Sequence, residues 1–154
     1  MSYDDFFKDF MQDIYARSAA DRDFSEVVFT ERVCDFLVEQ AVLENYTAAS
    51  YKKETLGIRV DAYDYSDESD MLTLIITNFH NEPASLTQTL ISKVLKRAVK
   101  FFAKGLDSSF HKSLDESDPG FNLARDINTF CSLKRLRKIR FILISNALLS
   151  KSVD

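Results

Sequence analysis

The side chains best suited to chemistry in this sequence are an aspartate in an alternating stretch and two groups of cations. Asp61 stands in the alternating segment 58–65, and five of the ten residues 61–70 are acidic. Five of the seven residues 134–140 are Lys or Arg. A further basic stripe recurs every three or four residues over 93–104, which predicts one face of a helix. Carboxylates bind divalent cations and clustered cations bind phosphates. The sequence therefore offers candidates for a metal site and for a phosphate-binding surface.

The charge of the chain is divided unevenly. The formal net charge is -4, but residues 1–90 carry 7 basic against 18 acidic side chains. Residues 91–154 carry 13 basic against 6 acidic side chains. This asymmetry favours contact between the later part of the chain and an anionic partner, or docking on an acidic surface.

Length and composition narrow the class of protein. The 154 residues suffice for one domain, and a hydrophobic fraction of 45% excludes a disordered chain. Cys34 and Cys131 lie far apart within apolar helical patterns, which excludes a disulfide scaffold and favours a reducing compartment. The sequence contains no glycine-rich phosphate loop and no nucleophile elbow. We expect a cytoplasmic protein without a membrane partner.

Hydrophobic spacing predicts the elements that hold these residues. Helical spacing indicates helices over 4–17, 24–44, 85–105 and 118–133, and alternation or apolar runs indicate strands over 46–53, 58–65, 71–79 and 138–145. The fold class is therefore α/β, with element order α-α-β-β-β-α-α-β. A helical lead (4–44) precedes an α/β core (46–145), and the two form a single domain over 1–154. The last strand is expected to run parallel to an earlier one, in a mixed sheet flanked by helices.

Alternation also predicts which side chains share a face of the second strand. Ile58, Val60 and Ala62 are expected on one face, with Asp61 on the other. The same spacing places Asp64 on the face opposite to Asp61.

The element order, with an aspartate in the second strand, resembles the core of the restriction-endonuclease-like nucleases. More narrowly, Gly-Ile-Arg-Val-Asp-Ala-Tyr-Asp-Tyr (57–65) followed by Leu-Thr-Leu-Ile-Ile-Thr-Asn-Phe (72–79) resembles the N-terminal region of AIPR-type abortive phage-resistance proteins. The resemblance extends over roughly residues 24–145. It implies the N-terminal domain of a longer protein, and Mg²⁺ or Mn²⁺ at Asp61 if the domain is an active nuclease.

The sequence departs from the nuclease motif at its second half. That motif needs Glu-x-Lys or Gln-x-Lys in the strand after the aspartate, and here Ile76 and Asn78 occupy those positions. Ile76 cannot ligate a metal ion, and Asn78 cannot supply the ammonium group of the motif lysine. Glu31 on the long helix is one alternative second acid. An ion pair of Asp61 with Arg59 or Lys53 is the alternative to any catalytic role.

We therefore expect a degenerate nuclease-like module of a phage-defence protein that contacts nucleic acid or protein, and we lean against enzymatic activity in this chain alone. An active metal-dependent DNA or RNA nuclease and an assembly or dimerisation domain are the alternatives. The expected partners are DNA or RNA, a downstream domain of the same protein, or a second copy. The candidate nucleic-acid contacts are Lys93, Lys96, Arg97, Lys100, Lys134, Arg135, Arg137, Lys138 and Arg140.

Overall fold

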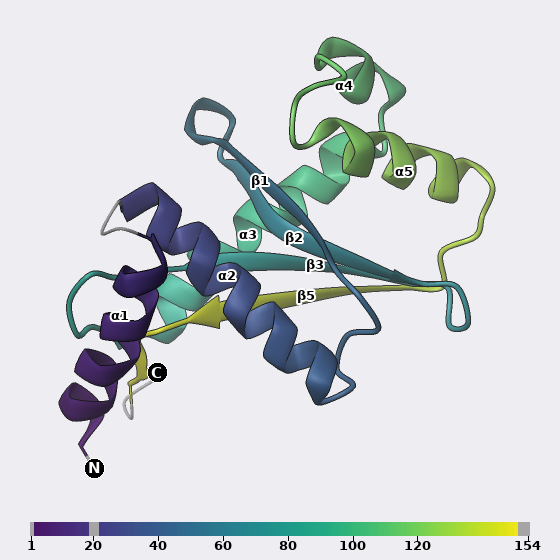
Figure 1. Cartoon of the computed structure of the whole chain (residues 1–154). Helices are drawn as coiled ribbons and strands as arrows, with labels where there is room; N and C mark the ends of the chain where they lie inside the picture. The colour runs from purple at the N-terminus through teal and green to yellow at the C-terminus, as the bar shows by residue number, and fades with distance from the viewer. Residues whose placement is uncertain (1, 19–21, 151–154) are drawn as a thin grey trace.

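A four-stranded mixed sheet forms the centre of the computed structural model, which describes residues 2–18 and 22–150 (Figure 1). The strands are β1 (Thr47–Lys53), β2 (Ile58–Ser66), β3 (Met71–Asn78) and β5 (Lys138–Ser145), in the order β1-β2-β3-β5. β1, β2 and β3 pair antiparallel, and β5 runs parallel to β3. The predicted α/β class, the mixed sheet and the parallel last strand are confirmed.

Helices cover both faces of this sheet. α1 (Tyr3–Ser18) and α2 (Arg22–Glu39) lie on one face, and α3 (Gln88–Gly105) and α5 (Phe121–Ser132) lie on the other (Figure 1). Between α3 and α5 the chain forms α4 (Ser108–Ser113). The remaining short elements are η1 (Glu54–Leu56), β4 (Ser85–Leu86) and β6 (Leu148–Leu149), of which β4 and β6 pair in parallel. No helix among the described residues has the length and apolar character needed to cross a bilayer.

Three hydrophobic clusters hold these layers together, one on the side of α1 and α2 and two on the side of α3. On the side of α1 and α2, Phe29 and Phe79 pack with Ala62 and Ile75 of the sheet. On the side of α3 and α5, Phe101 is fully buried among strand residues. Because each apolar helical face is buried against one face of the sheet, removal of this area from water is the main stabilising contribution.

β2 departs from simple alternation in the middle. Val60 packs in the cluster with Phe101, whereas Ala62 packs in the cluster with Phe29, so these two residues lie on opposite faces. The prediction that they share a face was wrong. Pairing with β1 shifts register between Ala48 and Tyr51, where an extra residue is accommodated. The change of face within β2, between Val60 and Ala62, lies directly opposite this bulge.

This irregularity also changes the face of the sheet on which Asp64 lies. Its carboxylate accepts the backbone N–H groups of Glu44 and Asn45, which follow α2, at 3.0 and 3.3 Å. Asp61 and Asp64 therefore both lie on the side of the sheet that α2 covers, and the prediction of opposite faces was wrong. The bonds to the chain after α2 make Asp64 a structural residue.

Three helix boundaries differ from the expected ones by three residues or more: the end of α2, the start of α3, and the start of α5, which begins at Phe121 rather than at 118. The second helix ends at Glu39 rather than at residue 44, because Ala41 adopts a left-handed conformation with φ 59°. At the start of α3, Thr87 is the N-cap, and its side chain accepts the N–H of Leu90 at 3.2 Å. An N-cap of this type satisfies a backbone donor that the helix itself cannot.

Candidate nucleic-acid interface and the Asp61 pocket

Asp61 is held by Arg59 and by the neighbouring strand. Arg59 Nε lies 3.0 Å from Asp61 Oδ2, and Arg59 Nη2 lies 3.0 Å from Oδ1. Oδ2 also accepts the backbone N–H of Thr77 at 2.7 Å. The described β2–β3 pairs run only as far as Ala62 with Ile75, so the Asp61 carboxylate binds an N–H just beyond the ladder. The expected alternative, an ion pair with Arg59, is the arrangement found.

A second carboxylate completes the ion-pair group around Arg59. Glu26 of α2 places Oε2 3.4 Å from Arg59 Nη2, and the Arg59 side chain is only 11% exposed. Desolvation lowers the pKa of this guanidinium, but the hydrogen bonds and charges of Asp61 and Glu26 outweigh it, so the pKa is raised overall. Glu31, the helix acid considered from the sequence, instead lines a separate pocket with Arg32 and Phe36.

The surroundings of Asp61 do not fit a divalent metal ion. Asp61 and Glu26 line a pocket of about 200 Å³, but Arg59 bridges both carboxylates and would repel a cation bound to them. Ile76 packs with Val94 and Ala98 of α3, on the face opposite to the Asp61 carboxylate. Across the described residues, no three His, Cys, Asp or Glu side chains converge in a group able to hold a metal.

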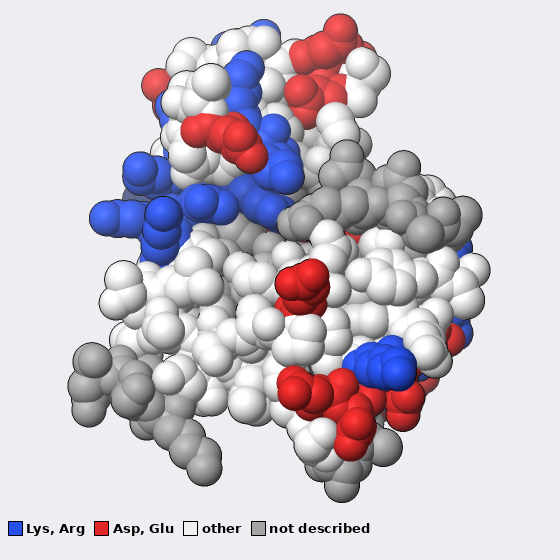
Figure 2. Space-filling model, turned by 90° about the vertical axis from the view of Figure 1, so that its left-hand side faces the viewer, with Lys and Arg blue, Asp and Glu red and all other residues white. Residues whose placement is uncertain are grey.

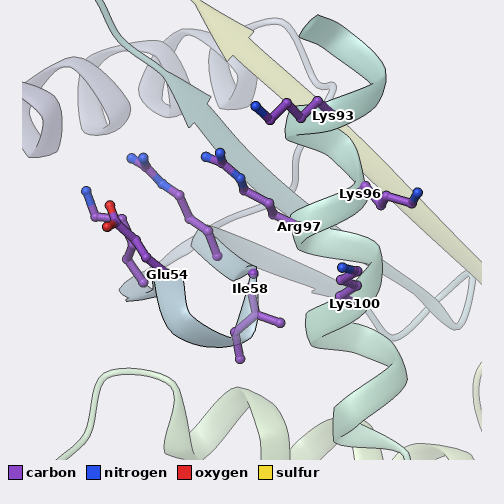
Figure 3. Close-up of a pocket in the computed structure, with 9 residues that line it drawn as sticks. Glu54, Ile58, Lys93, Lys96, Arg97 and Lys100 are labelled. Atoms are coloured by element: carbon purple, nitrogen blue, oxygen red, sulfur yellow. The ribbon is translucent and has the colours of Figure 1, made fainter. Parts of the chain in front are cut away.

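A larger, cationic pocket of about 510 Å³ lies between α3 and the turn that joins β1 to β2 (Figure 3). Its lining residues are Lys52, Glu54, Gly57, Ile58, Arg59, Lys93, Lys96, Arg97 and Lys100. Six of these nine residues carry a positive charge and one carries a negative charge. We call this the basic pocket. All four α3 residues of the predicted stripe that were singled out as nucleic-acid contacts line it.

The helix and the turn contribute different parts of the basic pocket. α3 buries Val94, Ala98 and Phe101 against the sheet, which leaves the cations between these positions at the surface. Lys93 and Arg97 extend from α3 to the same side, toward the side of the pocket where Glu54 lies (Figure 3).

At the turn, Gly57 adopts φ 65°, a left-handed conformation that favours glycine. A Cβ added at Gly57 would lie 3.6 Å from Lys100 Nζ. The ammonium group of Lys100 therefore lies directly beside the turn, which makes this turn one wall of the basic pocket.

Cations of the basic pocket are largely uncompensated. None of the ion pairs formed within the described residues includes Lys52, Lys93, Lys96, Arg97 or Lys100. Figure 2 shows Lys and Arg side chains gathered in a band across one face of the molecule, with Asp and Glu mostly above and below it. Such a concave region of one sign focuses the field and attracts anions.

The second basic group, residues 134–140, lies elsewhere. Lys138 pairs with Met71 at the start of β3, next to the end of β2, whereas the basic pocket lies at the start of β2. β2 has nine residues, so roughly 25 Å of strand separates the two groups, at opposite ends of the sheet (Figure 1). The structure does not combine them into one surface.

Several cations of this second group have structural contacts. Arg140 Nη2 donates to the carbonyl of Val42 at 2.7 Å, and Arg140 Nε donates to Thr73 Oγ1 at 3.0 Å. The Arg135 guanidinium lies over the Phe130 ring, 5.5 Å from its centroid. Arg137 is highly exposed and lies 3.9 Å from Asp70. Arg140 is thus bound within the fold, while Lys134, Arg137 and Lys138 remain at the surface.

Sequence reasoning missed two residues of the basic pocket, Lys52 and Arg59. They are direct cross-strand partners in the β1–β2 pairing. The available signal was the turn expected near Gly57, since a hairpin brings the residues on either side of its turn opposite one another, but the register that pairs Lys52 with Arg59 is centred on η1 rather than on the glycine.

Comparison with known proteins shows the family of this chain. No curated protein and no solved structure matches the chain. A family model described as the abortive infection phage resistance protein N-terminal domain matches residues 29–153. The matched region includes most of α2, all four strands of the main sheet and the helices α3, α4 and α5. This chain belongs to the family of abortive infection phage resistance protein N-terminal domains.

Proposed function

We propose that this phage-defence domain binds nucleic acid through the basic pocket and does not itself hydrolyse it. The observation that carries the proposal is the pairing of two features: a pocket with six cations, and an Asp61 carboxylate bound by a guanidinium. Phosphate contacts supply most of the affinity of sequence-independent nucleic-acid binding. The domain would then hold nucleic acid for a longer protein.

We expect no hydrolysis because the positions of the nuclease motif lack the groups that hydrolysis requires. A metal-dependent nuclease needs a divalent ion to stabilise the charge that develops at the scissile phosphate. At Asp61 the neighbouring positive charge is Arg59, which has no exchangeable site for water or phosphate oxygen of the kind a metal ion offers. Asn78 supplies no ammonium group at the lysine position.

Fluorescence anisotropy with labelled DNA and RNA of twenty nucleotides, single- and double-stranded, tests the binding. We expect affinity that falls steeply with salt, and a loss of about tenfold or more in the double variant Lys93→Glu/Arg97→Glu, because two phosphate contacts become repulsive. The matched control is Lys8→Glu/Lys112→Glu, which makes the same change in net charge at two exposed lysines outside the basic pocket. The variant Lys134→Glu/Arg137→Glu measures what the second basic group contributes.

A plasmid-nicking assay with Mg²⁺ or Mn²⁺ tests the absence of hydrolysis. We expect no cleavage by the wild type. Metal-dependent nicking that disappears in Asp61→Asn would overturn the non-hydrolytic part of the proposal. Equal loss of binding in the pocket variant and in the Lys8/Lys112 control would overturn the assignment of binding to the basic pocket.

A further inference from the structure

The basic pocket offers cations but no surface for a base. Its lining contains Lys, Arg, Glu, Gly and Ile, and it contains no Phe, Tyr or His. Proteins that hold unpaired bases stack them on aromatic rings, each worth about 1–3 kcal/mol, so this contribution is missing here. The lining also contains no Asn or Gln, the side chains that read adenine edges, and its Lys and Arg side chains bind phosphates as well as guanine edges.

The tyrosines of the neighbouring strands do not supply the missing rings. Tyr51 is buried, with its ring 5.3 Å from that of Phe101. Tyr65 stacks on Phe130, with ring centroids 4.4 Å apart. Both rings are therefore engaged in packing and are not among the residues that line the basic pocket.

We infer that the basic pocket takes successive phosphates of a nucleic-acid backbone and discriminates against no base. This inference rests on the proposed function and names the part of the nucleic acid that the pocket contacts. Lys93, Arg97 and Lys100 bind from α3, and Lys52 binds from the β1–β2 turn. Their charges are uncompensated, whereas the single carboxylate in the lining, Glu54, disfavours an anion only at one edge.

Arg59 gives this pocket one fixed donor group. Its Nε and Nη2 atoms are bound to Asp61 and Glu26, which orient the guanidinium, and no described residue accepts a hydrogen bond from Nη1. Because its charge is balanced by two carboxylates, Arg59 adds a directed hydrogen-bond donor rather than net attraction. The exposed lysine side chains are flexible and change conformation around this fixed guanidinium, which suits a nucleic-acid backbone of variable conformation.

The closing experiment compares three single-stranded probes by anisotropy: labelled dT and dA twenty-mers and a twenty-mer with abasic sites throughout. We expect the three dissociation constants to agree within about threefold, and long-chain inorganic polyphosphate to displace each probe. In the Lys93→Ala/Arg97→Ala variant, the log–log salt slope for dT is expected to shrink by about 1.4, since each single-strand phosphate contact contributes about 0.7.

The outcomes separate this inference from the proposed function. Normal binding of dT with tenfold weaker binding of the abasic probe would overturn the inference and leave nucleic-acid binding in place. Polyphosphate binding that depends on Lys93 and Arg97, without binding of any oligonucleotide, would overturn the proposed function but support the phosphate pocket. If no probe binds at low salt, both are wrong.

Discussion

The guanidinium of Arg59 meets the carboxylate of Asp61 through two hydrogen bonds of 3.0 Å, Nε to Oδ2 and Nη2 to Oδ1. Both side chains are largely removed from water, at 11% and 12% exposure. A pair formed in this environment is strongly stabilising relative to either charge alone, because each partner offsets the desolvation of the other. Asp61, the residue that most resembles a catalytic aspartate, therefore stabilises the fold through its ion pair with Arg59.

Removing one partner should therefore destabilise the protein. We expect Asp61→Ala to lower the free energy of unfolding by about 3 kcal/mol, because it leaves Arg59 buried with only Glu26 and leaves the Thr77 N–H without its acceptor. Urea denaturation followed by circular dichroism measures the change. The control is Asp13→Ala, whose partners Arg17 and Arg32 lie at the surface, with an expected loss of about 1 kcal/mol or less. Equal losses in the two variants would contradict this ranking.

Much of this fold could be predicted because helices and strands follow from the spacing of apolar residues that are close together in the sequence. Periodicity placed the strand at 138–145 and the helix over α3, and it identified the α3 cations, since apolar spacing alone defines the outward face. The face that Ala62 occupies could not be predicted, because alternation breaks within β2, where the pairing with β1 shifts register and the Asp61 carboxylate binds the Thr77 N–H. The contribution of Lys52 and Arg59 to the basic pocket depends on pairing between strands, which a single sequence does not specify.

The end of α2 offers a stabilising substitution. Ala41 adopts φ 59° just after the helix, and the N–H of Val42 donates to the carbonyl of Leu37 at 2.8 Å. This geometry is the Schellman motif, in which glycine avoids the Cβ strain of the left-handed region. We expect Ala41→Gly to raise the free energy of unfolding by about 1 kcal/mol. A thermal or urea unfolding curve measures the gain.

The same change within a helix gives the opposite sign. Ala16 lies inside α1, so Ala16→Gly should lower stability by about 1 kcal/mol through the poorer helix propensity of glycine. If Ala41→Gly were as destabilising as Ala16→Gly, the left-handed conformation at Ala41 would be wrong.

Two tyrosines should respond in opposite ways to loss of the hydroxyl. Tyr51 Oη is buried and has no hydrogen-bond partner among the described residues, so Tyr51→Phe should raise the free energy of unfolding by about 1 kcal/mol. Tyr46 Oη donates to Asp35 Oδ1 at 2.7 Å, so Tyr46→Phe should lower it by about the same amount. Urea midpoints of the two variants, measured beside the wild type, check the signs. A loss of stability in Tyr51→Phe would show that its hydroxyl finds a partner.

The two thiols should differ in reactivity. Cys34 is fully buried, and burial together with the charges of Asp35 and Asp61 raises its pKa to about 12. Cys131 is half-buried, and burial also raises its pKa. With a disulfide reagent at pH 8, we expect Cys131 to react first and Cys34 to react only as the protein unfolds, because the thiolate is the nucleophile. Loss of the faster phase in Cys131→Ser would assign that phase to Cys131. Fast labelling that persists in Cys131→Ser would contradict the burial of Cys34.

The raised pKa of Cys34 also predicts a dependence of stability on pH. The thiol ionises near pH 9 in the unfolded chain and only near pH 12 in the folded one, so the unfolded state loses protons first as pH rises. Its contribution to stability is complete below pH 9 and declines as pH increases toward 12. The urea midpoint should therefore fall between pH 8 and about pH 10, and it should fall less in Cys34→Ala. If the midpoint fell equally with pH in Cys34→Ala, the alkaline loss of stability would belong to other groups, among them buried Tyr51 and half-buried Tyr63, whose pKa values are also raised.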